Sequence, residues 1–196
     1  MPRIAIPDQF ADSPTSFVLA THAREISAAA LAYSKAVYQH SMVSLREFEG
    51  ARARVAQING CLVCQKFRSA RDVPGYMEGI GGNPARAISG HGHPEPDEAF
   101  YEAVAQWRES PLFSERERLA IELADRFSQA PKSLDHDEVF WDAMHANFSD
   151  AEIVDLTLSI GCWVAGGRFM HVLGLDQVAC DVPGAGVPRA VREAAE

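Results

Sequence analysis

The stretch SLREFEGARARVAQINGCLVC, residues 44–64, contains the signals that decide the fold of this chain. It opens on Ser44 and Glu47, which have the S-x-x-E spacing whose two side chains satisfy free N–H groups in the first turn of a helix. Asn59-Gly60, a pair that ends helices, comes directly before the two cysteines. We therefore expect a helix over 44–58, with the cysteine pair at the start of the next helix.

The same signals recur along the chain and predict an all-α fold. Two further S-x-x-E boxes begin at Ser114 and Ser149, and the Ala-rich stretch 27–32 favours helix by propensity. No run of β-branched residues alternates in the manner of a strand. The expected helices cover roughly residues 16–42, 44–58, 61–72, 97–109, 114–129, 135–147 and 149–172.

The length of 196 residues predicts one helical domain, over 1–178, followed by a Gly/Pro-rich tail over 179–196. A loop over 79–96 separates a front half from a back half. Two similar halves are one alternative for this architecture. An offset of 105 pairs two of the capping boxes and an offset of 103 pairs Arg68 with His171, so the two alignments conflict and the repeat stays open.

Composition and charge restrict the classes of function. The net charge is −9, from 18 basic and 27 acidic residues, which argues against binding to nucleic acid or to an anionic membrane surface. The most apolar stretch, 153–175, contains Asp155, Arg168 and His171, so we expect a buried helix there rather than a membrane span. The N-terminus has no apolar signal segment, and we expect a cytoplasmic protein.

Cys61 and Cys64 form a C-x-x-C pair, and a close pair in a reducing compartment is typically catalytic or metal-binding. A thiol at a helix N-terminus is favoured as thiolate, and an offset of three residues places both sulfurs within reach of a disulfide. The alternatives are half of a zinc site or two buried cysteines. Zinc would need two further ligands, and Cys162 and Cys180 do not form a second pair, so no metal or cofactor is expected.

Glu49 and Arg68 are the charged candidates beside this pair. Glu49 shares a helix face with small and apolar residues, so we expect it to be drawn inward, with a raised pKa that suits proton exchange. The alternative is an exposed Glu49 paired with Arg46 or Arg52. Arg68 is expected one helical turn after Cys64, where its charge would stabilise a thiolate, and the alternative is a surface arginine.

Three other residues are weighed and set aside. His91 and His93 lie in the Gly/Pro-rich loop, where two histidines alone do not complete a metal site. Cys162 lies in an apolar run and is expected to be a small buried residue.

Glu49 followed by Asn59-Gly60-Cys61-Leu62-Val63-Cys64 resembles the motif of the carboxymuconolactone decarboxylase and alkylhydroperoxidase D superfamily. The resemblance covers roughly residues 15–175 and implies an all-α fold that assembles as an obligate homo-oligomer, commonly a trimer or hexamer. It implies that Cys64 attacks a hydroperoxide, that Cys61 resolves the product, and that Glu49 belongs to a proton relay. In peroxidase members of the superfamily, a dithiol partner then reduces the cysteine pair.

The chain departs from the family motif at two positions. Arg68 stands where a histidine usually follows the second cysteine, and Val63 stands where some peroxidase members have another histidine. His171 is the candidate replacement in the relay, with a satisfied histidine near a helix end as the alternative. The decarboxylase members generally do not use the cysteine pair, so its presence favours redox chemistry.

These observations predict a thiol-dependent, peroxidase-like oxidoreductase that reduces hydroperoxides or exchanges disulfides. Its partners would be a small hydroperoxide or disulfide substrate, a dithiol reductant and further copies of the chain. Two alternatives stay open. One is a proton-transfer enzyme on a lactone or dienoate with Glu49 as acid and base, and the other is a non-catalytic oligomeric redox sensor.

Overall fold

The computed structural model describes residues 1–91 and 94–177, and within these ranges all regular structure is helical, which confirms the all-α prediction. His93, Cys180 and the predicted tail over 179–196 lie outside the described residues. The α-helices are α1 (Pro14–Thr21), α2 (Arg24–His40), α3 (Leu45–Asn59), α4 (Leu62–Lys66), α5 (Ser69–Gly79), α6 (Glu98–Ala103), α7 (Glu115–Gln129), α8 (Glu138–Asn147) and α9 (Asp150–Val172). Short 3-10 turns are η1 (Asp8–Phe10), η2 (Pro84–Arg86), η3 (Ile88–Gly90), η4 (Val104–Gln106) and η5 (Pro131–Leu134).

Two of the expected helices are each divided into two α-helices, and the helix expected over 97–109 is the short α6 followed by the 3-10 turn η4. The helix expected over 16–42 breaks at Ala23, whose left-handed φ of 43° interrupts the helical hydrogen bonds. The helix expected over 61–72 breaks at Phe67 and Arg68, where the backbone is extended. The helices expected over 44–58, 114–129 and 149–172 begin and end within one residue of the prediction.

The second break has a clear chemical cause. In a continuous helix the carbonyl of Cys64 would accept the N–H of Arg68, four residues later. Here the Cys64 carbonyl accepts from the Arg52 guanidinium at 2.7 Å, and the N–H of Arg68 donates to the Asp72 carboxylate at 2.8 Å. Both groups that would continue the helix are therefore bonded elsewhere, and α5 starts afresh.

The centre of the molecule is the pair α3 and α7. Ion pairs join Arg46 to Glu117, Glu47 to Arg116 and Arg54 to Asp125, at sequence offsets of 71, 69 and 71. Because the offset is nearly constant, the two helices run side by side in the same direction. Their facing apolar side chains form the main core with α9, and its central members include Phe48, Ala51, Val55, Ala120, Leu123, Leu156 and Ile160.

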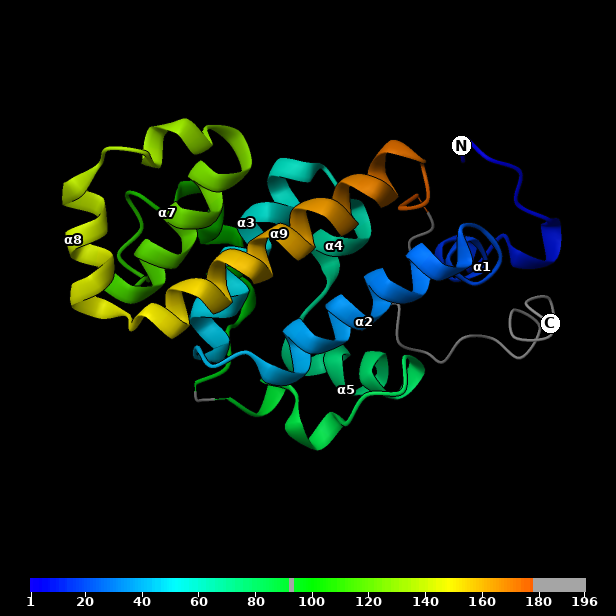
Figure 1. The fold of residues 1–196 in the computed structure, drawn as a ribbon, viewed down its shortest axis with the longest axis horizontal. Coiled ribbons are helices and arrows are strands. Elements are labelled where there is room, and N and C mark those ends of the chain that lie inside the picture. Colours follow the sequence, from blue (N-terminus) through cyan, green and yellow to red (C-terminus); the bar gives the residue numbers. More distant parts are fainter. Residues whose placement is uncertain (92–93, 178–196) are drawn as a thin grey trace.

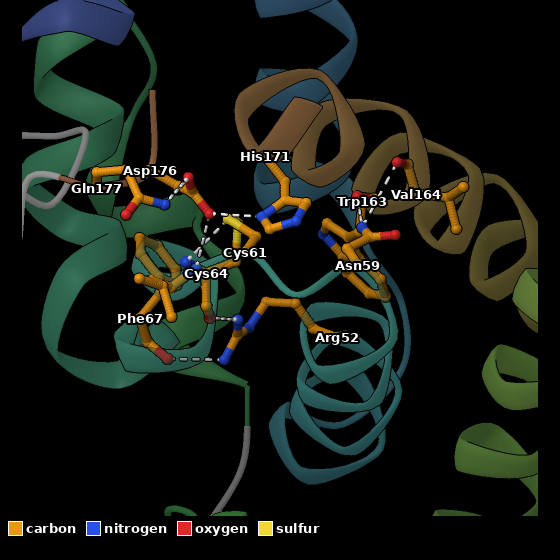
Figure 2. Close-up of a disulfide and its surroundings, with 11 residues drawn as sticks. Arg52, Asn59, Cys61, Cys64, Phe67, Trp163, Val164, His171, Asp176 and Gln177 are labelled. Atoms are coloured by element: carbon orange, nitrogen blue, oxygen red, sulfur yellow. Dashed lines mark hydrogen bonds and ion pairs between the residues drawn. A yellow bond between two sulfur atoms is a disulfide. The ribbon is translucent and has the colours of Figure 1, made fainter. Parts of the chain in front are cut away.

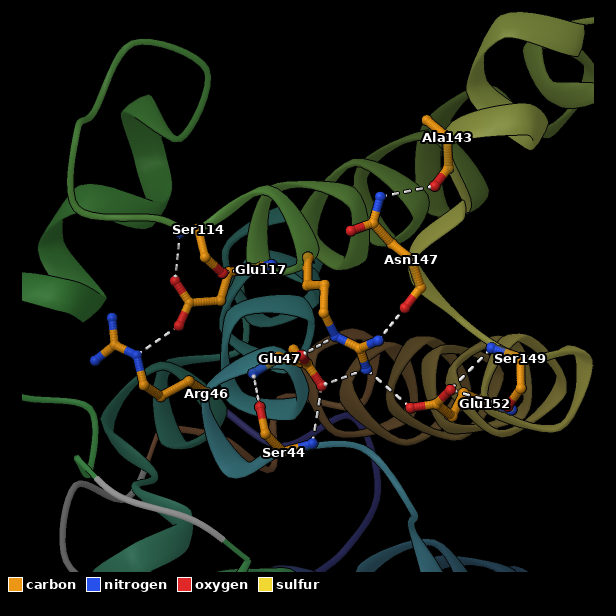
Figure 3. Close-up of polar contacts among 10 residues, drawn as sticks. Ser44, Arg46, Glu47, Ser114, Glu117, Ala143, Asn147, Ser149 and Glu152 are labelled. Carbon is orange, nitrogen blue, oxygen red and sulfur yellow. Dashed lines mark hydrogen bonds and ion pairs between the residues drawn. The ribbon is translucent and has the colours of Figure 1, made fainter. Parts of the chain in front are cut away.

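The three predicted capping boxes are all confirmed, at the N-termini of α3, α7 and α9. Figure 3 shows that they are also joined to one another. Arg116 donates to Glu47 of the first box at 2.6 Å and to Glu152 of the third at 2.8 Å, while Arg46 donates to Glu117 of the second. The predicted relation between two halves of the chain stays a prediction.

Helix α9 is buried along one face only, which corrects the expectation of a buried helix. It packs on α3, α7 and α2, as Figure 1 shows, but Val154, Leu158 and Val172 are more than half exposed. Among the described residues, α9 alone is long and apolar enough to cross a membrane by length and composition, a test that the core helices of globular proteins also pass.

Candidate functional site

The turn before the cysteines is fixed against α9. Gly60 ends α3 with a φ of 69°, a conformation that favours glycine. The Asn59 amide donates to the Trp163 carbonyl at 3.0 Å and accepts from the Arg168 guanidinium at 3.1 Å. These bonds join the C-terminus of α3 to the middle of α9 and set the position from which the cysteine segment starts.

Cys61 and Cys64 are joined by a disulfide, with their Cα atoms 5.3 Å apart, as the spacing predicted. Cys61 is the N-cap of α4, and its Sγ accepts the N–H of Cys64 at 3.3 Å. The two cysteines differ in exposure, because Cys61 is completely buried and Cys64 is partly accessible. An incoming molecule therefore reaches Cys64 first.

Glu49 is fully buried, as one of the sequence interpretations predicted, and pairs with Arg52, which is buried as well. Its carboxylate also accepts from the Ser69 hydroxyl at 2.7 Å, from the Ser69 N–H at 3.1 Å, and from the Tyr101 hydroxyl. Arg52 in turn donates to the carbonyls of Cys64 and Phe67, both at 2.7 Å. The pair thus holds the backbone of the segment that follows the two cysteines.

The expectation of a raised pKa for Glu49 is wrong. Burial alone would raise it, but the charge of Arg52 and hydrogen bonds from Arg52, Tyr101 and Ser69 outweigh burial and hold the pKa of Glu49 below its usual value. The carboxylate is consequently ionised at neutral pH, with its oxygens already bonded. Its contacts with Arg52, Ser69 and Tyr101 give it a structural role in holding the neighbouring backbone in place.

Arg68 does not lie one turn along a helix from Cys64, because the backbone is extended at this point. Its guanidinium forms a two-bond ion pair with Glu98, at 2.7 and 2.9 Å, and lies 3.9 Å from the centre of the Tyr101 ring. Within the part of the chain that the structure describes, its polar contacts are with Glu98 and with backbone carbonyls rather than with sulfur. No contact among the described residues supports the prediction that Arg68 stabilises a Cys64 thiolate.

His171 lies beside the cysteine pair, at the end of α9, although its sequence position is 107 residues after Cys64. Its Nδ1 is 3.0 Å from the carboxylate of Asp176, and the same oxygen accepts the N–H of Leu62 at 3.1 Å. The imidazole also packs over Gly60, where an added Cβ would lie 3.3 Å from the ring. Figure 2 shows His171 and Asp176 gathered around the disulfide.

Asp176 was missed by sequence reasoning. It follows α9 in a segment with no motif, and the only local signal is its position five residues after His171. It is buried, which by itself would raise its pKa, but the hydrogen bonds with His171 and with the N–H of Leu62 lower that pKa below the usual value. Asp176 is thus an ionised acceptor for His171.

A cavity of about 420 Å³ lies next to Cys64, the partly accessible cysteine of the pair. It lies between α1, α2, α3 and α9, and its lining is mainly apolar and includes Cys64. The described residues of its wall do not include Cys61 or His171. Cys162 also lines it, with a thiol pKa raised to about 11 by burial, so this cysteine is a poor nucleophile at neutral pH.

His91 is the histidine of this loop that lies within the described residues. The carbonyl of His91 accepts the N–H of Leu45 at 2.7 Å, so His91 is held at the start of α3. Over residues 1–91 and 94–177, no group of three His, Cys, Asp or Glu side chains is arranged to hold a metal ion.

Comparison with known proteins supports the fold more than the chemistry. No protein-family model matches the chain. It is 37% identical over 82 residues to the uncharacterized protein YnjA of Escherichia coli strain K12, a match that spans 41% of this chain and only 44% of YnjA. A crystal structure of a protein of unknown function from Agrobacterium tumefaciens, described as a candidate antioxidant defence protein AhpD, superposes with a TM-score of 0.58 at 23% identity, covering 89% of this chain and 96% of that one. This similarity confirms the predicted alkylhydroperoxidase D-like fold.

Replacing Gly60 with alanine tests the packing of the turn against His171. G60A should lower the free energy of unfolding by about 1–2 kcal/mol through its left-handed backbone and by a further ~1–3 kcal/mol through crowding of the ring. G81A is the matched control, because Gly81 has a φ of 70° but nothing within 4 Å of the added Cβ. Urea unfolding of both variants measures the difference, and equal losses would contradict the contact.

Replacing Glu49 with glutamine tests the buried ion pair. Because the folded-state pKa of Glu49 is lowered, its contribution to stability is complete above the unfolded pKa of about 4.3 and is lost as the pH falls through the folded value. E49Q should therefore cost about 3–5 kcal/mol at pH 7, since Arg52 is left buried and unpaired. The difference from the parent should shrink below about pH 4 in acid unfolding curves. A difference that does not change with pH would contradict the ionised pair.

Proposed function

We propose that this chain, which has the alkylhydroperoxidase D-like fold, is a thiol-dependent peroxidase that uses Cys64 and Cys61 as its redox pair. The observation that carries the proposal is the unequal setting of the two sulfurs. Cys64 is partly accessible and lines a cavity, whereas Cys61 is buried behind it and bonded to it. This arrangement suits one attacking and one resolving thiol.

The proposed cycle has three balanced steps. The Cys64 thiolate attacks the hydroperoxide, an S–O bond forms as the O–O bond breaks, and the alkoxide takes up a proton to leave as alcohol. The Cys61 thiol then displaces the oxygen from the Cys64 sulfenic acid as water, which gives the disulfide. An external dithiol reduces this disulfide by thiol exchange and becomes a disulfide itself.

The cavity supports a substrate with an apolar body. Its walls are mainly apolar, and the polar groups among them are largely bonded to the protein, as in the contact of Ser34 with the Tyr76 hydroxyl at 2.7 Å and of the Tyr33 hydroxyl with a carbonyl of α9. An apolar group that enters the cavity releases water from these walls. We infer that an organic hydroperoxide is bound in preference to hydrogen peroxide.

The contacts of Glu49 favour this redox proposal over lactone or dienoate chemistry. An acid and base for that reaction needs a pKa near neutrality and reach to the substrate. Glu49 instead has a lowered pKa and holds Arg52, which holds the cysteine segment. The proposal extends to a dithiol reductant, assembly as a trimer or hexamer and a cytoplasmic location, which rest on the motif, the family resemblance and the composition.

Serine substitutions of the two cysteines separate their roles. C64S should reduce hydroperoxide turnover to the background rate, because the attacking atom is gone. C61S should still consume one equivalent of cumene hydroperoxide per chain, because the first step needs only Cys64, but it should stop at the sulfenic acid. Peroxide consumption and mass spectrometry with a sulfenic-acid trap measure both outcomes.

These two variants are controls for each other, since each removes one sulfur from the same turn. Turnover that survives C64S would overturn the peroxidase proposal. If the parent protein forms a reversible disulfide but shows no turnover with any hydroperoxide and dithiol, the redox-sensor alternative is favoured.

Filling the cavity tests the preference for an apolar substrate. Gly166 lines it, and an added Cβ there meets nothing within 4 Å. G166L should raise KM for cumene hydroperoxide and leave hydrogen peroxide turnover nearly unchanged, because only the bulky substrate loses space. The change replaces a glycine within α9 and favours helix by about 1 kcal/mol, so lost folding should not imitate the effect. Equal changes for both peroxides in steady-state assays would exclude the cavity as the substrate site.

A further inference from the structure

The buried thiol of Cys61 poses a proton-transfer problem for the proposed cycle. To attack the Cys64 sulfenic acid, Cys61 must first lose its proton, because the thiolate is the nucleophile. Cys61 has no exposed surface, so bulk water is not in contact with it to accept this proton. The motif position that usually supplies a histidine is Arg68, whose charge is paired with Glu98.

His171 and Asp176 contact the two chain neighbours of Cys61, one on each side. The imidazole packs over Gly60, the residue before Cys61, with Nε2 3.4 Å from the position of a Gly60 Cβ. The Asp176 carboxylate binds the N–H of Leu62, the residue after Cys61, at 3.1 Å. A contact of 3.0 Å joins His171 to Asp176, so both are fixed to the same short segment of backbone.

We propose that His171, held by Asp176, is the base that takes the proton from Cys61 when this thiol closes the disulfide. The inference rests on the proposed redox role of the cysteine pair and assigns its proton transfer to residues outside the motif. His171 supplies the base, and Asp176 is a positioning residue that acts through it.

The proton balance of the closing step is complete. The Cys61 thiol gives its proton to the imidazole, and the resulting thiolate attacks the sulfur of the Cys64 sulfenic acid. An S–S bond forms and the S–O bond breaks, with the oxygen leaving as hydroxide. The imidazolium returns the proton to that hydroxide, so water is released and His171 is again neutral.

The geometry explains why Asp176 is needed. As an ionised acceptor it fixes the proton of the neutral imidazole on Nδ1, which leaves Nε2 with a free lone pair. It also stabilises the imidazolium that forms during the transfer. The His171 side chain is 47% exposed, so the imidazole can exchange protons with solvent, which buried Cys61 cannot do.

Other groups near the pair are less suited to this task. Glu49 has a lowered pKa and its oxygens accept hydrogen bonds from Arg52, Ser69 and Tyr101. The cavity lies on the Cys64 side, and neither Cys61 nor His171 is among the described residues of its wall. The arrangement thus separates the approach of substrate, at Cys64, from proton transfer, at Cys61.

The test measures disulfide closure separately from the first oxidation. Fully reduced protein is mixed with one equivalent of cumene hydroperoxide, and quenched samples are analysed for sulfenic acid and disulfide by mass spectrometry. In H171A, peroxide consumption should change little, while closure should slow on the order of 100-fold, the usual effect of losing a general base. Added imidazole should restore closure in proportion to its concentration, because the vacated position is open to solvent.

D176N tests the positioning role with nearly the same shape. It should also slow closure and leave the first oxidation unchanged, but imidazole should not restore its rate, since the histidine is still present. H145Q is the control for removal of a histidine. His145 also contacts an aspartate, Asp150, at 3.5 Å, but it lies on α8 rather than beside the cysteine pair. H145Q should behave as the parent protein in both steps.

A second oxidant makes the inference independent of peroxidase activity. Oxidised glutathione forms a mixed disulfide with Cys64, and Cys61 must lose the same proton to release glutathione. If the parent protein does not react with peroxides, the peroxidase proposal fails while this closure still reports on His171. The inference would be overturned if closure in H171A were as fast as in the parent. It would also be overturned if closure were slow and imidazole restored it in neither H171A nor H171G.

Discussion

The buried ion pair between Arg52 and Glu49 is the interaction on which the site depends. Two charges removed from water are costly unless their hydrogen-bonding groups are satisfied. Here Ser69 and Tyr101 donate to the carboxylate, and the guanidinium donates to the carbonyls of Cys64 and Phe67. Because these carbonyls are used in this way, the helix after the cysteines ends early and the cysteine turn is held against α3.

Helix α9 gives this turn its two different surroundings. Toward Cys64 it contributes the apolar wall of the cavity, including Trp163 and Met170. Toward Cys61 it contributes His171 from its last turn, and Asp176 is bonded to this histidine. Since Asn59 bonds to the carbonyl of Trp163, this one contact fixes the turn relative to both the cavity wall and His171. The substrate side and the proton side of the proposed cycle thus depend on one helix.

The relation of Arg68 to the site shows where reading by sequence pattern fails. Its spacing from Cys64 suggested one helix and one face, but the helix breaks because its carbonyl acceptors are taken by Arg52, a residue from the preceding helix. Of the two interpretations of Glu49, the buried one is correct, but the raised pKa expected with it is wrong because Arg52 pairs with the carboxylate. An inward position follows from periodicity, whereas the partner that sets the pKa is a matter of tertiary contact.

By itself the sequence determined the all-α fold, the three capped helices and the cysteine pair, because caps and helix propensity act over three or four residues. Only the tertiary structure decided the break after the pair, the ionised state of Glu49, the pairing of Arg68 with Glu98, and the place of Asp176. These features depend on contacts such as that of Leu62 with Asp176, 114 residues apart. A local sequence pattern does not predict contacts between residues so far apart in the chain, because these contacts depend on how α3 and α9 pack.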